Sequence, residues 1–327
     1  MSNEELKPIL GNKDNALDRL IMGVGRASRA TPAIRGKNWL YLAILKALGA
    51  ESRRTVIVAP LAQPVEYRAE LDLRSWLQRL AFVSGAYESN TVSFLIRLIQ
   101  AHPRRGAIFD IGANVGLISI PLAILLRRLD KIGSGTVVYA FEPVQDNFAQ
   151  LKRNVELNEL GEAIRLFDVA LGDARKVVEI QIEGNLAPGE GSGTANILPE
   201  ASTYRCTRIP MALRPLDEMV LTKEIDSNVS VIKIDTDGYD LKVFEGARDL
   251  FLKSRPVAYG EFNAHCLGWH GQSIASVRAY AKEIGYDVFL KIPSVFRFSR
   301  GADDDNFVQD LLFVPQEFVP HYSWCLS

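Results

Sequence analysis

The feature that most constrains the fold is an alternation, beginning at residue 106, of short apolar runs with segments of helical periodicity. The predicted strands and helices are 107–111, 117–128, 136–141, 145–158, 164–171, 229–234, 241–251, 257–262 and 274–284. Such alternation is typical of a parallel sheet with helices on both faces. The last two predicted strands, 286–292 and 308–314, have no helix between them, so we expect an antiparallel pair at the sheet edge.

The first part of the chain has a different pattern. Residues 1–84 are predicted to be a helical N-terminal extension, and residues 85–327 one large domain, within the length of about two average domains. Segment 38–48 is apolar nearly all round. Segment 71–82 has helical periodicity, with one apolar face made of Leu73, Trp76, Leu77 and Leu80. We therefore expect both segments to be helices.

Charge is distributed unevenly along the chain, although the net charge is only −1. Residues 1–105 contain 16 basic and 9 acidic side chains, against 22 and 30 in the remainder. We interpret this asymmetry as attraction between two parts of one protein or as scattered solvated charge. The alternative is an anionic substrate or membrane surface near the first part.

The spacing of the cysteines and the hydropathy of the chain indicate the cellular compartment in which we expect the protein. Cys206, Cys266 and Cys325 are far apart and form no close pair, which is typical of free thiols in a reducing environment. The first 15 residues are too polar for a secretory signal, and the longest apolar stretches are shorter than the roughly 18 residues of a membrane span. We therefore expect a cytoplasmic protein with no transmembrane segment.

The first predicted strand leads into a glycine turn and a helix, in the segment Phe109-Asp-Ile-Gly-Ala-Asn-Val-Gly-Leu117. Gly112 and Gly116 have no Cβ, so a ligand can approach the backbone closely at the helix N-terminus. Asp110, already at the end of the first strand, would repel a pyrophosphate and favour a cation. The turn therefore indicates S-adenosylmethionine, which carries a sulfonium and an ammonium, as the cofactor.

The next two strands end in further candidate cofactor ligands. Glu142 and Pro143 follow the second strand, and the Glu142 carboxylate can accept hydrogen bonds from both ribose hydroxyls. A surface turn is the alternative role of Glu142. At the tip of the third strand, Asp168 can accept the adenine amino group while Val169 packs on the ring.

Several motifs together resemble the FkbM family of class I S-adenosylmethionine-dependent methyltransferases, over about Gly85 to Val314. They are Gly85-Ala-Tyr-Glu88, Asp110-Ile-Gly-Ala-Asn-Val-Gly116, Phe141-Glu-Pro-Val144, Lys233-Ile-Asp-Thr-Asp-Gly238 and Phe244-Glu-Gly-Ala247. The resemblance implies an α/β fold with a Rossmann-like seven-stranded sheet, mostly parallel with an antiparallel last strand. It also implies cofactor contacts from Tyr87, Glu88, Asp110, Gly112, Asn114, Gly116, Glu142, Pro143, Asp168, Val169 and Asp235.

One position departs from the family pattern. Where the family usually has Asp-x-Glu-Gly, this chain has Asp235-Thr-Asp237-Gly, with a carboxylate one methylene shorter. By resemblance, the methyl acceptor is a hydroxyl of a sugar, a glycan or a secondary metabolite. In-line transfer to a hydroxyl needs a proton acceptor. The candidate bases are Asp235, Asp237, Glu261 and the loop residues His265 and His270, although each histidine can equally be an ordinary surface residue.

Three alternatives remain open at this point. Asp235, Glu261 and Asn263 resemble the divalent-metal ligands of catechol-type O-methyltransferases, but a metal is not favoured. A second alternative is a non-catalytic cofactor-binding or interaction module. The third concerns assembly, since the extension can cap the site or mediate a homodimer. A nucleic acid partner is not expected, because the Asn/Asp-Pro-Pro-aromatic loop of amino methyltransferases is absent after the fourth strand.

Overall fold

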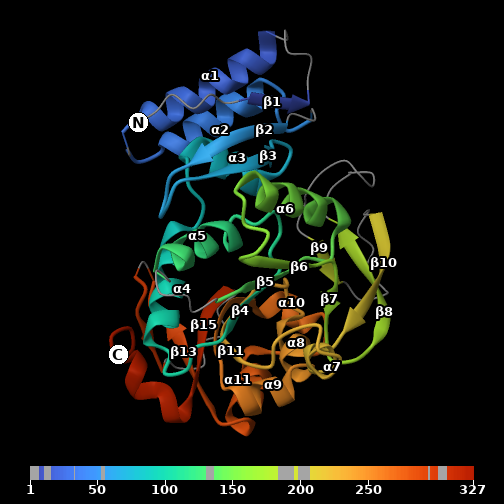
Figure 1. The fold of residues 1–327 in the computed structure, drawn as a ribbon. Helices are drawn as coiled ribbons and strands as arrows, with labels where there is room; N and C mark the ends of the chain where they lie inside the picture. The colour runs from blue at the N-terminus through green and yellow to red at the C-terminus, as the bar shows by residue number, and fades with distance from the viewer. Residues whose placement is uncertain are drawn as a thin grey trace.

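A large twisted sheet with helices on both faces forms the centre of the molecule in this computed structural model (Figure 1). The structure describes residues 7–10, 16–32, 34–52, 56–129, 136–182, 195–197, 207–293, 295–300 and 308–327. Cys206 lies outside these ranges, as does the glycine-rich segment 183–194. In the described part, Cys266 and Cys325 are buried free thiols.

The central sheet has eight strands in the order β14-β13-β15-β12-β11-β4-β5-β6. Their bounds are β4 Ala107–Ile111, β5 Val138–Phe141, β6 Ile164–Phe167, β11 Val229–Ile234, β12 Val257–Asn263, β13 Tyr286–Lys291, β14 Phe298–Ser299 and β15 Val308–Pro315. Strands β6, β5, β4, β11 and β12 are mutually parallel. β15 inserts between β12 and β13 and is antiparallel to both. The expected mostly parallel sheet and antiparallel last strand are confirmed, and the two-residue β14 extends its edge.

Alternate side chains of each strand enter two separate hydrophobic cores. Ile108 belongs to the core under α4–α6, whereas its neighbour Phe109 belongs to the core under α7–α11, as the two-residue period of a strand requires. Figure 1 shows the two helical layers on opposite faces. The helices are α4 Ser89–Ala101, α5 Ser119–Leu129, α6 Gln145–Leu157, α7 Leu216–Leu221, α8 Asp240–Glu245, α9 Arg248–Ser254, α10 Ala264–Gly268, α11 Ile274–Glu283 and the 3-10 helix η1 Gln316–Tyr322.

Two predicted elements of the large domain are divided in the structure. The predicted strand 164–171 splits into β6 and β7 (Ala170–Leu171), and β7 joins a second sheet of order β7-β10-β8-β9. Its other strands are β8 Lys176–Ile182, β9 Ala195–Ile197 and β10 Thr207–Arg214. The predicted helix 241–251 breaks near Gly246, where a Cβ would lie 1.9 Å from the carbonyl oxygen of Gly172. The close contact between Gly246 and Gly172 therefore interrupts the helix, although the helical pattern of the side chains continues past it.

The N-terminal extension contains the expected helices and a three-stranded antiparallel sheet that was not expected. Its elements are β1 Lys7–Leu10, α1 Ala16–Ala30, α2 Lys37–Ala47, β2 Val56–Leu61, β3 Tyr67–Asp72 and α3 Trp76–Ser84. The predicted helix 71–82 was wrong in its first residues, because Leu71 and Asp72 pair with β2 as part of β3. Tyr67, Ala69 and Leu71 are buried while Arg68 is exposed, so a strand-like pattern leads into the helical one.

The extension is packed firmly on the large domain. One hydrophobic core includes Ile21 and Phe82 from the extension as well as Ile120 of α5 and Leu151 of α6. The expected division at residues 84 and 85 falls at the end of α3, where Gly85 has a left-handed φ of 74°. None of the helices in the described ranges is both long and apolar enough to cross a bilayer.

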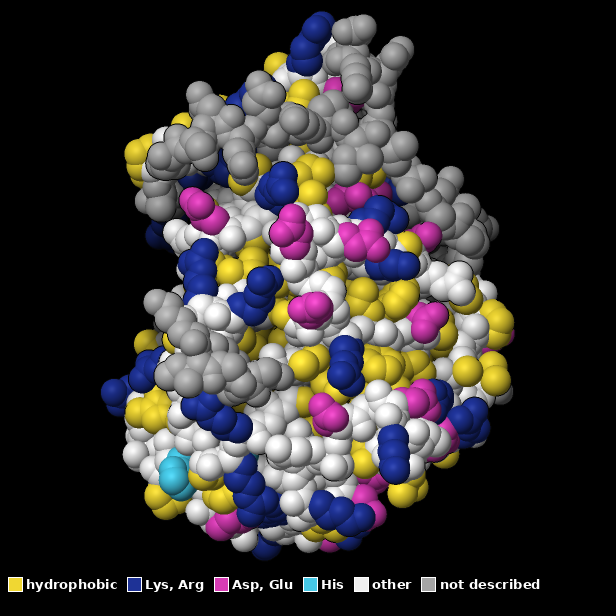
Figure 2. All heavy atoms as spheres, in the orientation of Figure 1, with side chains coloured by type: hydrophobic (Ala, Val, Ile, Leu, Met, Phe, Trp, Pro, Cys, Tyr) yellow, Lys and Arg dark blue, Asp and Glu magenta, His cyan; other side chains and the backbone are white. Residues whose placement is uncertain are grey.

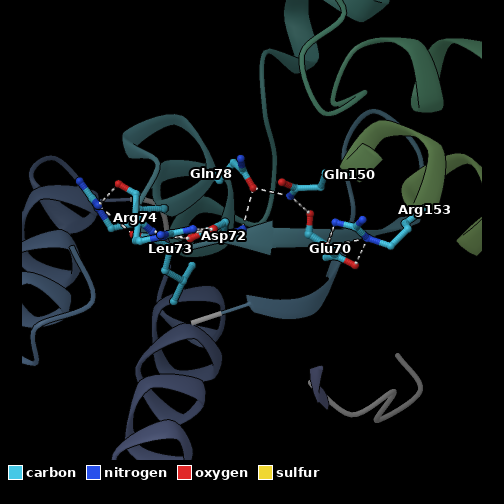
Figure 3. Close-up of polar contacts among 8 residues, drawn as sticks. Glu70, Asp72, Leu73, Arg74, Gln78, Gln150 and Arg153 are labelled. Atoms are coloured by element: carbon cyan, nitrogen blue, oxygen red, sulfur yellow. Dashed lines mark hydrogen bonds and ion pairs between the residues drawn. The ribbon is translucent and has the colours of Figure 1, made fainter. Parts of the chain in front are cut away.

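A buried polar contact fixes β3 against α6 (Figure 3). The Glu70 carboxylate accepts hydrogen bonds from Nε and Nη2 of Arg153, and Gln150 Nε2 donates to Gln78 Oε1 at 2.6 Å. Asn154, which is fully buried, accepts from the Glu70 N–H at 2.6 Å and donates to the Val115 carbonyl at 2.9 Å. The extension therefore meets the helix that follows the second core strand.

We expect Asn154→Ala to lower the free energy of unfolding by about 2–4 kcal/mol, because it leaves buried backbone groups of Glu70 and Val115 unpaired. Asn158→Ala is the matched control. Asn158 is half-buried and makes the same type of contact with Arg68, but these hydrogen bonds are exposed and water can replace them, so the loss should be below about 1 kcal/mol. Urea unfolding measures both values, and equal losses would contradict the role given to Asn154.

Candidate functional site

A cavity of about 290 Å³ lies where the carboxyl ends of β4, β5, β11 and β12 meet. This is the place at which open α/β sheets bind ligands. Residues Leu77 and Gln78 of α3 also line the cavity, so the extension contributes to its wall. The predicted site residues on the lining are Tyr87, Glu88, Gly112, Asn114, Glu142, Pro143, Val169, Asp235, Asp237 and Glu261.

The glycine turn after β4 is constrained sterically. Gly112 has a φ of 78°, and a Cβ there would lie 1.9 Å from the carbonyl oxygen of Asp235. Gly116 has a φ of 88°, and a Cβ would lie 2.7 Å from Leu151. Gly116 does not line the cavity, so the glycine is required for packing on α6, while Gly112 brings the turn against the end of β11.

Asp110 is fully buried and does not line the cavity. Its carboxylate accepts a hydrogen bond from the Ser119 hydroxyl and lies 3.4 Å from the Lys233 ammonium. Lys233 is also buried, lies 3.5 Å from the Asp235 carboxylate and donates to the Gly112 carbonyl. In this structure Asp110 is therefore paired with Lys233. The ion pair holds the ends of β4 and β11 together beside the cavity.

Burial and neighbouring charges act in opposite directions on Lys233. Burial alone would lower the pKa of its ammonium. The carboxylates of Asp110, Asp235 and Glu88 outweigh that effect, so the pKa is raised above its usual value. Lys233 therefore stays charged, and it links the first and fourth core strands electrostatically.

Glu142 connects the two turns that follow β4 and β5. Its carboxylate accepts hydrogen bonds from the backbone N–H of Asn114 and of Val144, each at 2.9 Å, and from the Asn147 side chain at 3.3 Å. Burial raises the pKa of Glu142 to about 7, although these hydrogen bonds oppose the shift. A carboxylate can accept about four hydrogen bonds, so Glu142 retains capacity for a ligand in the cavity.

The loop after β11 is held by a buried carboxylate that the sequence analysis did not single out. Asp240 accepts hydrogen bonds from the Thr236 backbone and hydroxyl, at 3.0 and 2.7 Å, and from the Gly238 N–H at 3.1 Å. Burial raises the pKa of Asp240 to about 6. Asp237 has a left-handed φ of 51°. Asp240 therefore fixes the loop that carries Asp235 and Asp237 on the cavity lining.

Glu261 is a carboxylate with the properties of a general base. It lies on β12 and lines the cavity with its side chain exposed. Partial burial raises its pKa to about 7, and the neighbouring carboxylates of Asp235, Asp310 and Glu88 act in the same direction. A base with a pKa close to neutral can accept a proton and remain largely ionised at physiological pH.

Other predicted residues lie elsewhere. Asp168 and His265 are exposed and do not line the cavity, and His265 has its ring against Trp269. His270 is also off the lining, with its ring edge against Tyr239, which does line it.

Of the three residues considered as metal ligands, Asp235 and Glu261 line the cavity but Asn263 does not. Asn263 Oδ1 caps α10 by accepting from the backbone N–H of His265 and Cys266. The described residues contain no group of three or more His, Cys, Asp or Glu placed to hold a metal ion. With Asn263 engaged at the N-terminus of α10, the three residues do not form the catechol-type ligand set.

Several lining residues were missed by sequence reasoning. Lys233, Thr236 and Tyr239 line the cavity beside the predicted carboxylates. A signal for Lys233 was present, because it is the one charged residue in the apolar strand 229–234. Leu77 and Gln78 carried no such signal, since their place on the lining depends on how the extension packs against α6.

The sequence profile of the Methyltransferase FkbM domain matches residues 110–288, more than half of the chain. A search of curated proteins found no match. Among solved structures, an FkbM methyltransferase from Methylobacillus flagellatus KT has 17% identity, with a TM-score of 0.37 over 64% of this chain and 45% of that one. This chain therefore spans less than half of that protein.

Two further solved structures are similar at the same level. The tRNA m1G37 methyltransferase of M. jannaschii has 13% identity, with a TM-score of 0.39 over 81% of this chain and 55% of that one. The precorrin-6y C5,15-methyltransferase of Geobacter metallireducens GS-15 has 14% identity, with a TM-score of 0.36 over 69% and 89%. By its match to the family profile, the chain belongs to the FkbM family of S-adenosylmethionine-dependent methyltransferases.

Proposed function

We propose that the cavity binds S-adenosylmethionine and that the protein transfers its methyl group to a hydroxyl. The observation that carries the cofactor proposal is the charge of the lining. Glu88, Glu142, Asp235, Asp237 and Glu261 line the cavity, and Lys233 is the single basic residue on the lining in the part of the chain that the structure describes. Such an excess of carboxylates favours a cationic ligand and disfavours a pyrophosphate.

The residues present fit the cofactor in named roles. Glu142 would hold the ribose hydroxyls, and Val169 and Pro143 would contact the adenosine. Asp235, Glu88 and Tyr87 would bind the methionine part, and Gly112 and Asn114 would present the backbone of the glycine turn. When bound, S-adenosylmethionine supplies an electrophilic methyl group. Asp168, His265 and Gly116 have no direct part in this proposal, because they do not line the cavity.

Glu261 is the proposed base. It would accept the proton of the acceptor hydroxyl, whose oxygen would form the new bond to the methyl group that S-adenosylmethionine would supply, with the cofactor's thioether as the leaving group. Alignment of the acceptor in line with the methyl group supplies the remainder of the rate enhancement. Asp237 lies on the same lining and is the alternative proton acceptor, which the measurements below distinguish from Glu261.

The proposed acceptor is a hydroxyl of a sugar, a glycan or a secondary metabolite, in a reducing cytoplasmic environment. The buried free thiols Cys266 and Cys325 support the compartment. Among the described side chains on the face in Figure 2, Lys and Arg alternate with Asp and Glu. That face therefore has no broad basic patch of the kind that binds nucleic acid.

Calorimetry with S-adenosylmethionine tests the cofactor proposal. We expect the wild-type protein to bind and Glu142→Gln to bind about ten- to a hundredfold more weakly, because charge-assisted hydrogen bonds to the ribose are lost. Glu156→Gln, on the exposed side of α6, is the control and should bind normally. No binding by folded wild-type protein would refute the cofactor site, and normal binding by Glu142→Gln would refute the role of Glu142.

A further inference from the structure

Helix α2 of the N-terminal extension presents an apolar face to solvent. Trp39, Leu40, Ala43, Ile44 and Ala47 are all exposed, with exposed fractions of 71% for Trp39, 60% for Leu40 and 36% for Ile44. At 100° per residue these five positions fall on one side of the helix, and the buried Leu42 and Leu45 fall on the other. We call these five residues the α2 face.

The α2 face is continued by neighbouring apolar side chains. The rings of Trp39 and Trp76 lie 5.8 Å apart, and Trp76 is 47% exposed. Ile34, just before the helix, is 64% exposed. A surface helix normally turns such side chains inward, and contiguous exposed apolar patches mark sites of association. We therefore expect another molecule or a membrane to cover the α2 face.

The charge around the α2 face is mainly positive, and the acidic side chain nearest to the helix end is Glu51, 3.7 Å from the Lys46 ammonium. Residues 19–48 contain six basic side chains and no acidic one: Arg19, Arg26, Arg29, Arg35, Lys37 and Lys46. Arg26, Arg35 and Lys46 are exposed. A second copy docked face to face would bring the same cations together, which opposes a symmetric dimer through α2. An anionic surface complements the patch instead.

Beside the α2 face is a groove of about 1180 Å³, whose lining includes Trp39 and Trp76. Its charged lining residues are basic (Arg29, Lys37 and Arg68) and acidic (Glu66 and Glu159), with the basic ones in excess. Arg29 is partly buried and donates to the Phe82 carbonyl, and it has no carboxylate partner among the residues that the structure describes. Burial lowers the pKa of Arg29, and Arg26 acts in the same direction. A phosphate bound in this groove would raise the pKa of Arg29 and so offset the effects of burial and of Arg26.

We propose that α2 is a membrane-interface helix that docks the protein on an anionic phospholipid surface. The helix has 11 residues, too few to cross a bilayer. Leu42 and Leu45 hold the other side of α2 on the protein, so only the exposed Trp39 and Leu40 would enter the lipid headgroup layer, with the neighbouring lysines and arginines on its anionic groups. This function is independent of methyl transfer, so cofactor binding serves as a separate measure of folding in each variant.

Vesicle co-sedimentation with the full-length protein tests the proposal. We expect binding to vesicles of phosphatidylcholine with about one third phosphatidylglycerol, and at least tenfold weaker binding to phosphatidylcholine alone. Trp39→Ser should weaken binding to the anionic vesicles about tenfold or more. Leu221→Ser is the matched control, because Leu221 is 80% exposed but lies on α7 in the large domain.

A triple variant tests the electrostatic part. Arg26→Gln, Arg35→Gln and Lys46→Gln together should weaken anionic binding about a hundredfold, whereas Arg128→Gln, Lys152→Gln and Lys223→Gln, all exposed, should leave it unchanged. Failure of the wild-type protein to bind anionic vesicles would overturn the proposal. So would a dimer in sedimentation velocity that Trp39→Ser dissociates, since the α2 face would then be a protein interface.

Discussion

Lys233→Met is expected to lower the free energy of unfolding by about 3–5 kcal/mol, because it removes the cation facing a buried carboxylate. Asp110 is fully buried, and the Lys233 ammonium lies 3.4 Å from it. Methionine retains most of the volume of the lysine stem, so the expected loss is electrostatic. Urea unfolding near pH 7 with circular dichroism measures it.

Two further variants make the Lys233 prediction specific. Asp110→Asn in the Lys233→Met background removes the uncompensated charge and should recover at least half of the lost stability. Lys253→Met removes an ion pair whose partners are 75% and 61% exposed, so it should cost less than about 1 kcal/mol. A Lys233→Met protein as stable as the wild type would show that the buried pair contributes nothing.

Glu261→Gln is expected to reduce methyl transfer by about 10²–10⁴-fold, because the amide cannot accept the proton, while cofactor affinity falls far less, since the other lining carboxylates remain. In the wild-type protein, the ionised and active form of Glu261 increases as the pH rises through its pKa of about 7. Below pH 7 the rate should therefore rise about tenfold per pH unit, and above it the rate should level off. Glu261→Gln should lose this dependence.

The assay follows labelled methyl groups into the acceptor fraction of a cell extract, with calorimetry as the measure of cofactor binding. Asp237→Asn is the control, since Asp237 lines the same cavity. If Asp237→Asn abolishes transfer and Glu261→Gln does not, the base is Asp237. If both variants retain full activity, the proposed proton acceptor is wrong.

The core sheet could be predicted because its strands are buried on both faces. Strands 107–111 and 229–234 have the predicted bounds, since short, largely apolar runs between turn residues are typical of strands buried on both faces, even with Asp110 and Lys233 within them. The three-stranded sheet of the extension could not be predicted. Leu71 and Asp72 fit a helical period as well as a strand, and only pairing with β2 decides between them.

The sequence predicted those site residues that lie at the carboxyl ends of the core strands. Glu142, Asp235 and Glu261 converge on one cavity because parallel strands end at one edge of the sheet. Asp110 is at the predicted place but in another environment, since no local pattern shows that Lys233 reaches across to it. Asp240 was missed for the same reason, because its role as the loop's hydrogen-bond acceptor depends on a three-dimensional turn.

The position of β15 affects how the sheet is assembled during synthesis. β15 inserts between β12 and β13, yet it follows every other strand of the sheet in the chain. Until it is made, β12 and β13 each present an unpaired edge that can join a strand of another nascent chain. Completion of the sheet therefore waits for the last strand to be translated, and a chaperone that shields the β12 and β13 edges would protect the protein at this stage.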